Sequence, residues 1–215
     1  MKKYDNTHIY EKGLDIVVSV SGGKDSTACA LHCIDRGLEF KNVFADTGWE
    51  HESTYEFLHQ LEKKIGTIHR VKKEIPVKED DIDFVNHIEE QLGFHSAFVR
   101  HCVRWKWVPS GTKRSCTREL KIHPIKKWVN EKTDVPIVVT GIRHDESLRR
   151  SKVEEWEWVD MYDGYAWRPI IQWTLEDVIK IHKRHNFEPN RLYYQNHDRV
   201  GCFPCIYVSK NNIKH

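Results

Sequence analysis

Short runs of apolar, β-branched residues mark the expected strands of this chain. Residues 14–20 (Leu-Asp-Ile-Val-Val-Ser-Val) form one such run, and residues 40–45 and 136–140 form two more. Residues 67–71 are a further strand candidate. Short runs that are apolar on both faces are typical of buried strands in a parallel sheet. We therefore expect these segments to form the centre of a sheet.

The segments between these runs have the periodicity of helices. In residues 53–65, Phe57, Leu61 and Ile65 recur at every fourth position and share one helical face. Other helices are expected at residues 26–35, at 82–92, at 122–132 with Pro124 in the first turn, and after an N-cap at Thr174, with Leu175, Val178, Ile179 and His182 as the apolar face. This alternation predicts an α/β fold: an open, mostly parallel twisted sheet with helices on both faces, built as a single domain over residues 1–215.

Composition supports a folded domain. Hydrophobic residues make up 39% of the chain and charged residues 31%, which differs from the composition of disordered chains. The sequence contains no apolar run of about 20 residues, the length that spans a bilayer. Its first residues lack the apolar stretch of a signal peptide. We therefore expect a cytoplasmic protein that does not enter the membrane.

The net charge of +2 is small, but it is unevenly distributed. The segment 100–127 is strongly basic and has Glu119 as its only acidic residue. Trp105 and Trp107 lie within this basic segment, and Trp128 follows it. Cations suit an anionic substrate, and cations with aromatic rings also suit a nucleic acid. Packing of these tryptophans in the core or at its rim is the alternative.

A glycine-rich turn follows the first predicted strand, in the sequence Ser21-Gly22-Gly23-Lys24-Asp25-Ser26. Two glycines let the backbone turn sharply, and the N-terminus of the following helix favours an anion. Lys24 adds a positive charge, and the two serines add hydroxyl donors. Asp25 is the exception, because a carboxylate beside a phosphate is unfavourable unless a divalent metal ion or backbone N–H groups bind it. The spacing differs from that of the Walker A loop.

This hexapeptide resembles the signature of the PP-loop ATP pyrophosphatases, and further segments resemble their phosphoadenosine phosphosulfate (PAPS) reductase branch. The matching segments are Val43 to Gly48, Gly141-Ile142-Arg143 with Glu146-Ser147, Trp167-Arg168-Pro169 to Val178, 190–194 and 199–205. The resemblance implies that the loop binds ATP, adenosine phosphosulfate (APS) or PAPS. It also implies that Asp46 and Thr47 lie beside the adenosine, and that Asp25 and Asp46 are near any Mg²⁺.

The same resemblance assigns roles to three further motif residues. Arg143 is expected to contact phosphate or sulfate, because its planar fork suits two oxygens, and Gly141 lies beside it. We expect Lys24, Asp25 and Arg143 to be catalytic. Arg168 is expected to be mainly structural, with a contact to the nucleotide as the alternative.

The six cysteines divide into two groups. Cys29 and Cys33 are expected to be core residues of a helix. The other four are candidate metal ligands. Cys202 and Cys205 form a Cys-x-x-Cys pair in a C-terminal loop region, and Cys116 lies in a segment that resembles the family's first cysteine site. Cys102 would supply the fourth thiolate, with an outside ligand as the alternative. Four thiolates suit a [4Fe–4S] cluster, with zinc or no metal as alternatives. Cluster-bearing reductases have two adjacent cysteines at the first site, whereas Thr117 follows Cys116 here.

Three functions remain open. One is reduction of an adenylyl sulfate, for which a thioredoxin-like protein would be the reductant. The second is ATP-dependent adenylation followed by sulfur transfer, with a sulfur donor and a nucleic-acid acceptor on segment 100–127. The family's reductases carry a nucleophilic cysteine in a C-terminal tail, and the sequence to His215 has none, which favours adenylation. The third is a nucleotide- or nucleic-acid-binding module without turnover. A homo-oligomer is compatible with each.

Overall fold

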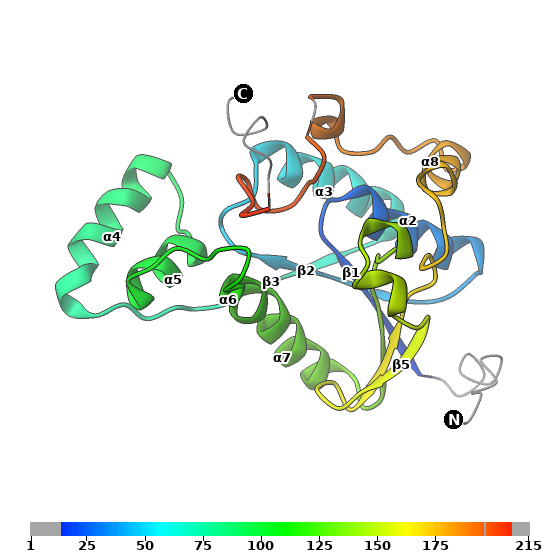
Figure 1. The fold of residues 1–215 in the computed structure, drawn as a ribbon, viewed down its shortest axis with the longest axis horizontal. Helices are drawn as coiled ribbons and strands as arrows, with labels where there is room; N and C mark the ends of the chain where they lie inside the picture. Colours follow the sequence, from blue (N-terminus) through cyan, green and yellow to red (C-terminus); the bar gives the residue numbers. More distant parts are fainter. Residues whose placement is uncertain (1–13, 196, 208–215) are drawn as a thin grey trace.

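One twisted sheet organises the fold of this chain (Figure 1). The computed structural model describes residues 14–195 and 197–207. The sheet has six strands in the order β3-β2-β1-β4-β6-β5. Their bounds are β1 Asp15–Val20, β2 Lys41–Asp46, β3 Ile68–Lys72, β4 Pro136–Val139, β5 Trp156–Val159 and β6 Gly164–Trp167. All neighbouring strands are parallel except the edge strand β5, which pairs antiparallel with β6. The predicted open, mostly parallel sheet is confirmed.

Helices cover both faces of this sheet, as predicted. The helices are α2 Lys24–Asp35, α3 Glu52–Ile65, α4 Glu79–Leu92, α5 Ala97–Trp105, α6 Ser115–Thr117, α7 His123–Lys132 and α8 Leu175–Arg184. One face packs against α2, α3 and α8, and the other packs against α7. Figure 1 shows α4 and α5 projecting beyond the β3 edge of the sheet.

The side chains of β1 explain why both faces are covered. Ile16, Val18 and Val20 belong to the core shared with α2, α3 and α8, whereas Val17 packs on the side of α7. Val17 and Val18 are both fully buried. Burying a side chain of this size contributes roughly 1.5–3 kcal/mol. A strand that is apolar at successive positions therefore gains stability on each face.

Several predicted bounds shift in the structure. Helix α2 begins at Lys24, two residues earlier than expected, and α4 begins at Glu79, three residues earlier. The acidic first turn of α4 lacks the apolar periodicity used for prediction, but it is stabilised by the helix dipole. Helix α5 and the β5–β6 hairpin were not expected. A five-residue π-helical turn, Arg118–Ile122, leads into α7.

The predicted apolar face of α8 is partly wrong. Thr174 is the N-cap as expected, and its side chain accepts a hydrogen bond from the backbone N–H of Asp177. Leu175 follows directly in the first turn and is 49% exposed. The buried residues are Val178, Ile181 and His182. The face that meets the sheet is therefore rotated away from Leu175.

Cys29 and Cys33 are core residues, as predicted. Both are fully buried in α2. Burial raises the pKa of the Cys33 thiol to about 12, and burial also raises the pKa of Cys29 well above its ordinary value. Both thiols are therefore protonated and unreactive. Over the described ranges, no helix combines the length and apolar character needed to cross a bilayer.

Candidate functional site

The loop at residues 21–26, here called the phosphate loop, joins the end of β1 to α2. Its shape is fixed by its own serines: the Ser21 N–H donates to Ser26 Oγ at 3.0 Å, and Ser26 Oγ donates to the Gly23 carbonyl at 3.0 Å. Gly22 has a φ of +75°, a conformation that favours glycine. A Cβ on Gly22 would also lie 2.6 Å from Thr54 Cγ2. The turn is therefore organised by the protein alone.

A second glycine brings the end of β4 against this loop. A Cβ on Gly141 would lie 2.6 Å from both Asp25 C and Ser26 N. Real Cβ atoms do not approach backbone atoms this closely. Only glycine at this position therefore lets the two segments pack together, as their neighbouring strands β1 and β4 require.

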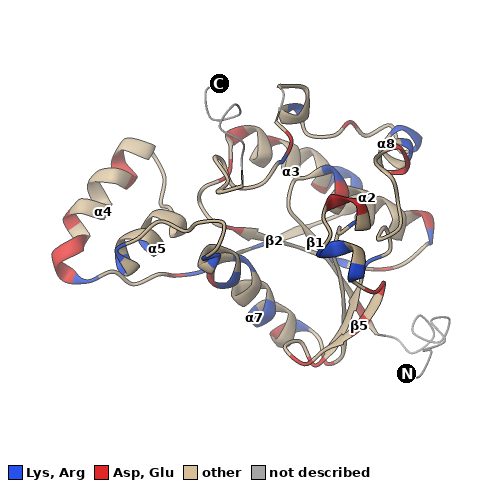
Figure 2. Cartoon of the chain, in the orientation of Figure 1, with Lys and Arg blue, Asp and Glu red and all other residues tan. Residues whose placement is uncertain are grey.

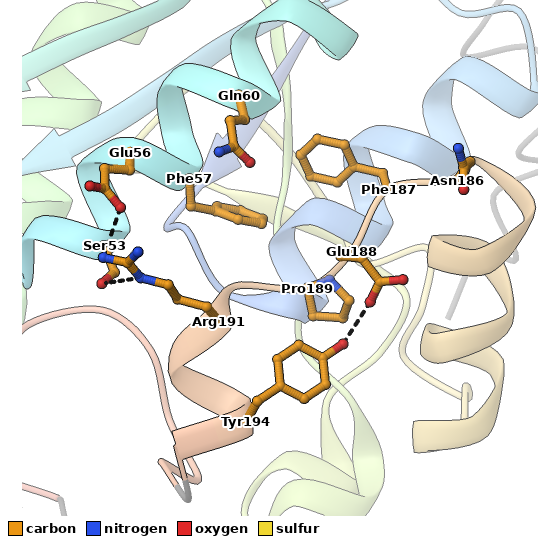
Figure 3. A pocket seen from close by; sticks show the side chains of 10 residues that line it. All are labelled: Ser53, Glu56, Phe57, Gln60, Asn186, Phe187, Glu188, Pro189, Arg191 and Tyr194. Atoms are coloured by element: carbon orange, nitrogen blue, oxygen red, sulfur yellow. Dashed lines mark hydrogen bonds and ion pairs between the residues drawn. The ribbon is translucent and has the colours of Figure 1, made fainter.

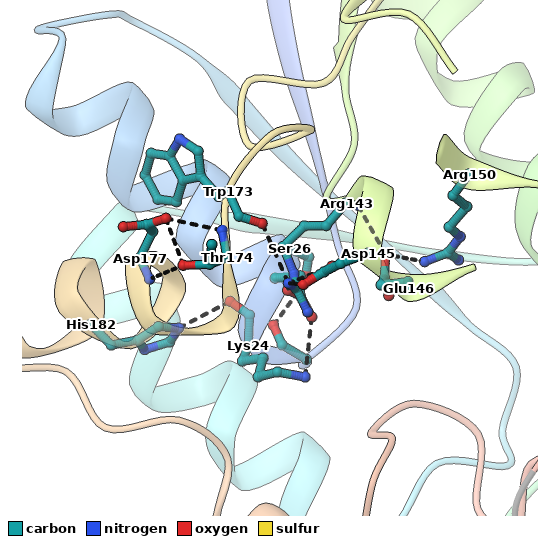
Figure 4. Close-up of polar contacts among 12 residues, drawn as sticks. Lys24, Ser26, Arg143, Asp145, Glu146, Arg150, Trp173, Thr174, Asp177 and His182 are labelled. Atoms are coloured by element: carbon teal, nitrogen blue, oxygen red, sulfur yellow. Dashed lines mark hydrogen bonds and ion pairs between the residues drawn. The ribbon is translucent and has the colours of Figure 1, made fainter. Parts of the chain in front are cut away.

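The partner of Asp25 is the side chain of Arg143, and not the metal ion or backbone N–H groups that were expected. Its Nε donates to Asp25 Oδ1 at 2.6 Å, and its NH1 donates to Asp145 Oδ2 at 2.6 Å. Lys24 Nζ lies 3.3 Å from Asp25 Oδ2. Figure 4 shows Arg143 between Asp145 and the start of α2. Burial works to lower the pKa of Arg143, but Asp25 and Asp145 outweigh it and raise the pKa. The guanidinium is therefore permanently charged.

A cavity of about 170 Å³ opens at the phosphate loop. It is lined by loop residues and by cations and acids from two other segments: Ser21, Lys24, Arg150, Arg199, Glu146 and Asp198. Ligand pockets usually measure about 300–1,000 Å³. The cavity therefore has room for an anionic group such as a phosphate, and any larger part of a ligand would extend outside it.

Tyr193 closes one side of this cavity and was missed as a single residue by sequence reasoning. Its hydroxyl accepts from the Lys24 N–H at 3.2 Å, and Lys24 Nζ lies 4.6 Å from the centre of its ring. Burial raises the pKa of Tyr193 to about 12. His182 Nε2 lies 3.0 Å from the Lys24 carbonyl. Segments far along the chain thus hold the backbone and side chain of Lys24.

A buried carboxylate lies beyond the end of β2, and sequence reasoning missed it. Glu50 is 7% exposed and accepts from Thr47 Oγ1 at 2.8 Å and from the Thr47 N–H at 3.2 Å. Tyr55 OH donates to Asp46 Oδ1 at 2.9 Å and is 3.3 Å from Glu50 Oε2. These contacts fix Asp46 and Thr47 at the same edge of the sheet as the phosphate loop.

The four candidate metal-ligand cysteines lie in two pairs. Burial and the nearby Cys116 raise the pKa of Cys102 to about 11. Cys202 and Cys205 both lie close enough to Lys121 to affect its pKa. Together with Glu50 they raise the pKa of Lys121 and outweigh the effect of its burial. Among the residues with described positions, no group of three or more His, Cys, Asp or Glu side chains could hold a metal ion. The four thiols as placed do not fit a four-ligand centre.

Arg168 lies at the base of the β5–β6 hairpin. Its NH2 donates to Glu157 Oε2 at 2.6 Å, and its NH1 donates to the Glu154 carbonyl at 2.9 Å. It is 8% exposed and is not among the residues that line the 170 Å³ cavity. These contacts support the structural role expected for this arginine.

A larger cavity of about 400 Å³ lies between α3 and the segment after α8 (Figure 3). Its polar side chains bind one another: Arg191 Nε donates to Ser53 Oγ at 2.8 Å, and Tyr194 OH donates to Glu188 Oε2 at 2.7 Å. The phosphate loop does not line it. The residues of the phosphate loop and the cations Lys24, Arg150 and Arg199 line the smaller cavity instead.

The sheet order, the glycine loop after β1 and the cavity at the carboxyl ends of the strands define an α/β protein with the PP-loop architecture. Residues 15–208 match the phosphoadenosine phosphosulfate reductase domain family. The chain therefore belongs to the PAPS reductase family.

Individual relatives and solved structures agree with this assignment. The chain is 34% identical over 229 residues to an uncharacterized 37.8 kDa protein of Escherichia phage 186, covering 92% of this chain and 68% of the phage protein. It is 25% identical over 193 residues to the adenosine 5'-phosphosulfate reductase of Oceanobacillus iheyensis, covering 90% and 72%. The PAPS reductase structure from Candida auris has a TM-score of 0.63 at 16% identity, covering 91% and 84%, and so shares the fold.

Proposed function

We infer that this chain is an enzyme whose phosphate loop holds the phosphates of an adenine nucleotide. The observation that carries this proposal is the cavity at residues 21–26, where Lys24 and two arginines converge on a preformed turn at the N-terminus of α2. Fixed N–H groups and cations stabilise negative charge without reorganising during a reaction. Lys24 would contact the phosphates, and Arg143 would hold Asp25 in place. Arg150 and Arg199 join Lys24 as cations of the cavity.

The first candidate reaction is reduction of an adenylyl sulfate, APS or PAPS. The adenosine 5'-phosphosulfate reductases among the relatives favour it. In this reaction a thiolate attacks the sulfur, the adenosine phosphate leaves, and a second thiol releases sulfite from the resulting thiosulfonate. A thioredoxin-like protein would supply the two electrons. The phosphate loop would hold the leaving phosphate.

The second candidate is adenylation with ATP, which needs no thiol nucleophile and which the cations of the cavity would also serve. An acceptor would attack the α-phosphorus, and pyrophosphate would leave into the cavity. Mg²⁺ would lie near Asp25 and Asp46, where it neutralises phosphate oxygens. Asp25 is bound to Arg143 and Lys24 in this structure, so a metal ion would compete with those cations. The basic segment 100–127 would bind a nucleic-acid acceptor. A sulfide-level sulfur nucleophile from a sulfur donor would then form the bond to carbon at the adenylated position and displace AMP.

The proposed [4Fe–4S] cluster, with zinc as the alternative, is a separate question. A cluster on Cys102, Cys116, Cys202 and Cys205 requires the loop with the last two cysteines to approach the first two. Anaerobic purification with iron, sulfide and zinc analysis tests it. About four irons and an absorption band in the visible range support the cluster. One zinc ion per chain without iron would identify a zinc site in place of the cluster. A folded protein that contains neither iron nor zinc would contradict both metal proposals.

Product analysis tests the proposed function. The protein is incubated separately with APS, PAPS and ATP, with a reduced thioredoxin for the first two and with single-stranded DNA or RNA for ATP. Sulfite identifies a reductase, and pyrophosphate identifies an adenylating enzyme. The matched control is Lys24→Ala, which should lower either product by about 100-fold because it removes a charge at the phosphates. Nucleotide binding without any product would instead favour a binding module.

A further inference from the structure

Cations and aromatic rings continue outward from the phosphate cavity. Arg199, which lines the cavity, lies over the ring of Tyr207, with its guanidinium carbon 5.5 Å from the ring centre. The guanidinium of Arg114 lies over the same ring at 5.1 Å. Tyr207 OH also donates to the Gly111 carbonyl at 3.0 Å. The loop before α6 and the C-terminal loop therefore lie side by side at the cavity.

The same kind of contact is repeated further along the basic segment. Lys113 Nζ lies 5.6 Å from the ring centre of Trp107, and the Arg104 guanidinium lies 5.7 Å from that of Trp105. Trp105 is 56% exposed, so much of its ring remains open to a partner. We call the whole set the cation–aromatic strip: Arg104, Trp105, Trp107, Lys113, Arg114, Arg199 and Tyr207.

Three acidic side chains near the basic segment form ion pairs with cations that do not belong to this strip. Asp81 and Glu89, both on α4, form ion pairs with Lys106 and Arg100. Glu119 pairs with Arg118 and lies 3.1 Å from His123 Nδ1. Figure 2 shows α4, with its acidic residues, beside α5. Asp198 and Glu146 lie at the cavity end of the strip. The four cations of the strip lie over rings, and Arg104 also donates a hydrogen bond to the Pro76 carbonyl.

Rings with cations beside them match one class of partner. Unpaired bases stack on aromatic side chains, while their phosphates contact lysine and arginine. A duplex cannot offer its bases in this way, because they are already stacked on one another. An acidic peptide would satisfy the cations but would gain little from the rings. The chemistry of the strip therefore fits a single-stranded nucleic acid.

We propose that the cation–aromatic strip binds single-stranded nucleic acid and leads it to the phosphate cavity. Arg199 belongs to both the strip and the cavity, so a strand on Tyr207 has a phosphate or sugar next to the bound nucleotide. Binding of single-stranded nucleic acid depends on the strip and does not require the proposed function. The further statement that the strand is the acceptor rests on the proposed function, in its adenylating form.

The first experiment measures affinity for fluorescently labelled 12-residue strands of DNA and of RNA, together with a DNA duplex, by anisotropy. The expected result is binding of one or both single strands more tightly than the duplex. With the four cations of the strip on phosphates, affinity should fall roughly 50-fold between 50 and 200 mM salt. Equal affinity for the duplex, or complete competition by polyglutamate, would overturn the proposal.

The second experiment tests the rings. Trp105→Ala and Tyr207→Ala should each weaken single-strand binding by about 5-fold or more, because base stacking on a ring is lost. Arg114→Lys keeps the charge but loses the planar group over Tyr207, and it should weaken binding less. Trp158→Ala is the matched control, since Trp158 is 45% exposed on the opposite edge strand β5. Equal effects of Trp158→Ala and Trp105→Ala would refute a role for the strip.

Calorimetry with ATP and APS separates this proposal from the proposed function. Trp105→Ala lies outside the cavity and should leave nucleotide binding within twofold of the wild type. If the wild type binds neither nucleotide but binds single strands through the strip, the proposed function fails and the strip remains. If it binds nucleotide but no single strand of DNA or RNA, the strip proposal fails alone.

Discussion

Replacing Gly141 by alanine should displace the phosphate loop from the end of β4. The added Cβ would lie 2.6 Å from Asp25 C and Ser26 N, about 0.8 Å short of an ordinary 3.4 Å contact. Both atoms belong to the backbone, so no flexible side chain can move aside. Gly141 is not one of the glycines with a positive φ, so alanine fits its backbone conformation. The effect of the substitution is therefore steric.

The expected cost is about 1–3 kcal/mol, the usual range for an overpacked site. If the loop keeps its position, this cost appears as lower stability in urea unfolding. If the loop moves, stability is preserved and nucleotide affinity falls by about 5- to 150-fold, because each 1.4 kcal/mol is a factor of ten. The loss in unfolding free energy and the loss in binding free energy, measured by urea unfolding and by calorimetry with ATP and APS, should together amount to about 1–3 kcal/mol.

Gly111→Ala is the control for this prediction. A Cβ on Gly111 would meet only Tyr207 Cε1 at 3.8 Å, an ordinary contact. This variant should match the wild type in both assays within about 0.5 kcal/mol. A Gly141→Ala protein with unchanged stability and unchanged affinity would show that the close approach of β4 to the loop is unimportant.

Three further predictions concern contacts around the site. Arg143→Met should destabilise the protein by roughly 1.5–3 kcal/mol in urea unfolding, because the half-buried Asp25 loses the hydrogen bond from its arginine and keeps only Lys24 as a cationic partner; Asp25→Asn in the same chain should restore part of the loss, and no rescue would contradict the pairing. Tyr193→Phe should cost about 1 kcal/mol in the same assay by leaving the Lys24 N–H without its partner, whereas a neutral effect would argue against this bond. Burial works to raise the pKa of Glu89, but hydrogen bonds from Arg100 and the Ser96 N–H outweigh it and lower the pKa. A lowered carboxyl pKa stabilises the fold above the ordinary value near 4.5, and this contribution is lost as pH falls through the lowered pKa. Glu89→Gln should therefore cost about 1–2 kcal/mol at pH 7 and less at pH 4, and a pH-independent difference would contradict the ion pair.

The central part of the fold was predictable from apolar patterning, because its strands are buried on both faces. Residues 14–20 show this most clearly, since successive valines of β1 pack on opposite sides of the sheet. The β5–β6 hairpin was missed because β5 is an exposed edge strand whose residues Trp156–Val159 lack a buried run. Helix α5 was missed because its buried residues, Ala97, Val99 and His101, do not follow the apolar i, i+4 spacing used for prediction, and its other positions include basic residues.

The site was predictable where one short segment carries the chemistry. The phosphate loop is such a segment, and the structure places Gly141 against it. Arg143, expected to contact phosphate or sulfate, instead binds Asp25 and Asp145 and is not among the residues that line the 170 Å³ cavity. Glu50 and Tyr193 escaped sequence reasoning because their role depends on contacts across the fold. The pairing of Asp25 with Arg143, 118 positions away, likewise has no local signal.

The most direct test of the central claim is calorimetric titration of the wild type and of Lys24→Ala with adenosine, AMP, APS and ATP. If the loop at residues 21–26 holds the phosphates, affinity should rise by at least tenfold from adenosine to ATP or APS. Lys24→Ala should remove most of that gain while leaving adenosine binding unchanged. Equal affinity for adenosine and the phosphorylated ligands, or a Lys24→Ala protein that binds them as tightly as the wild type, would contradict the account.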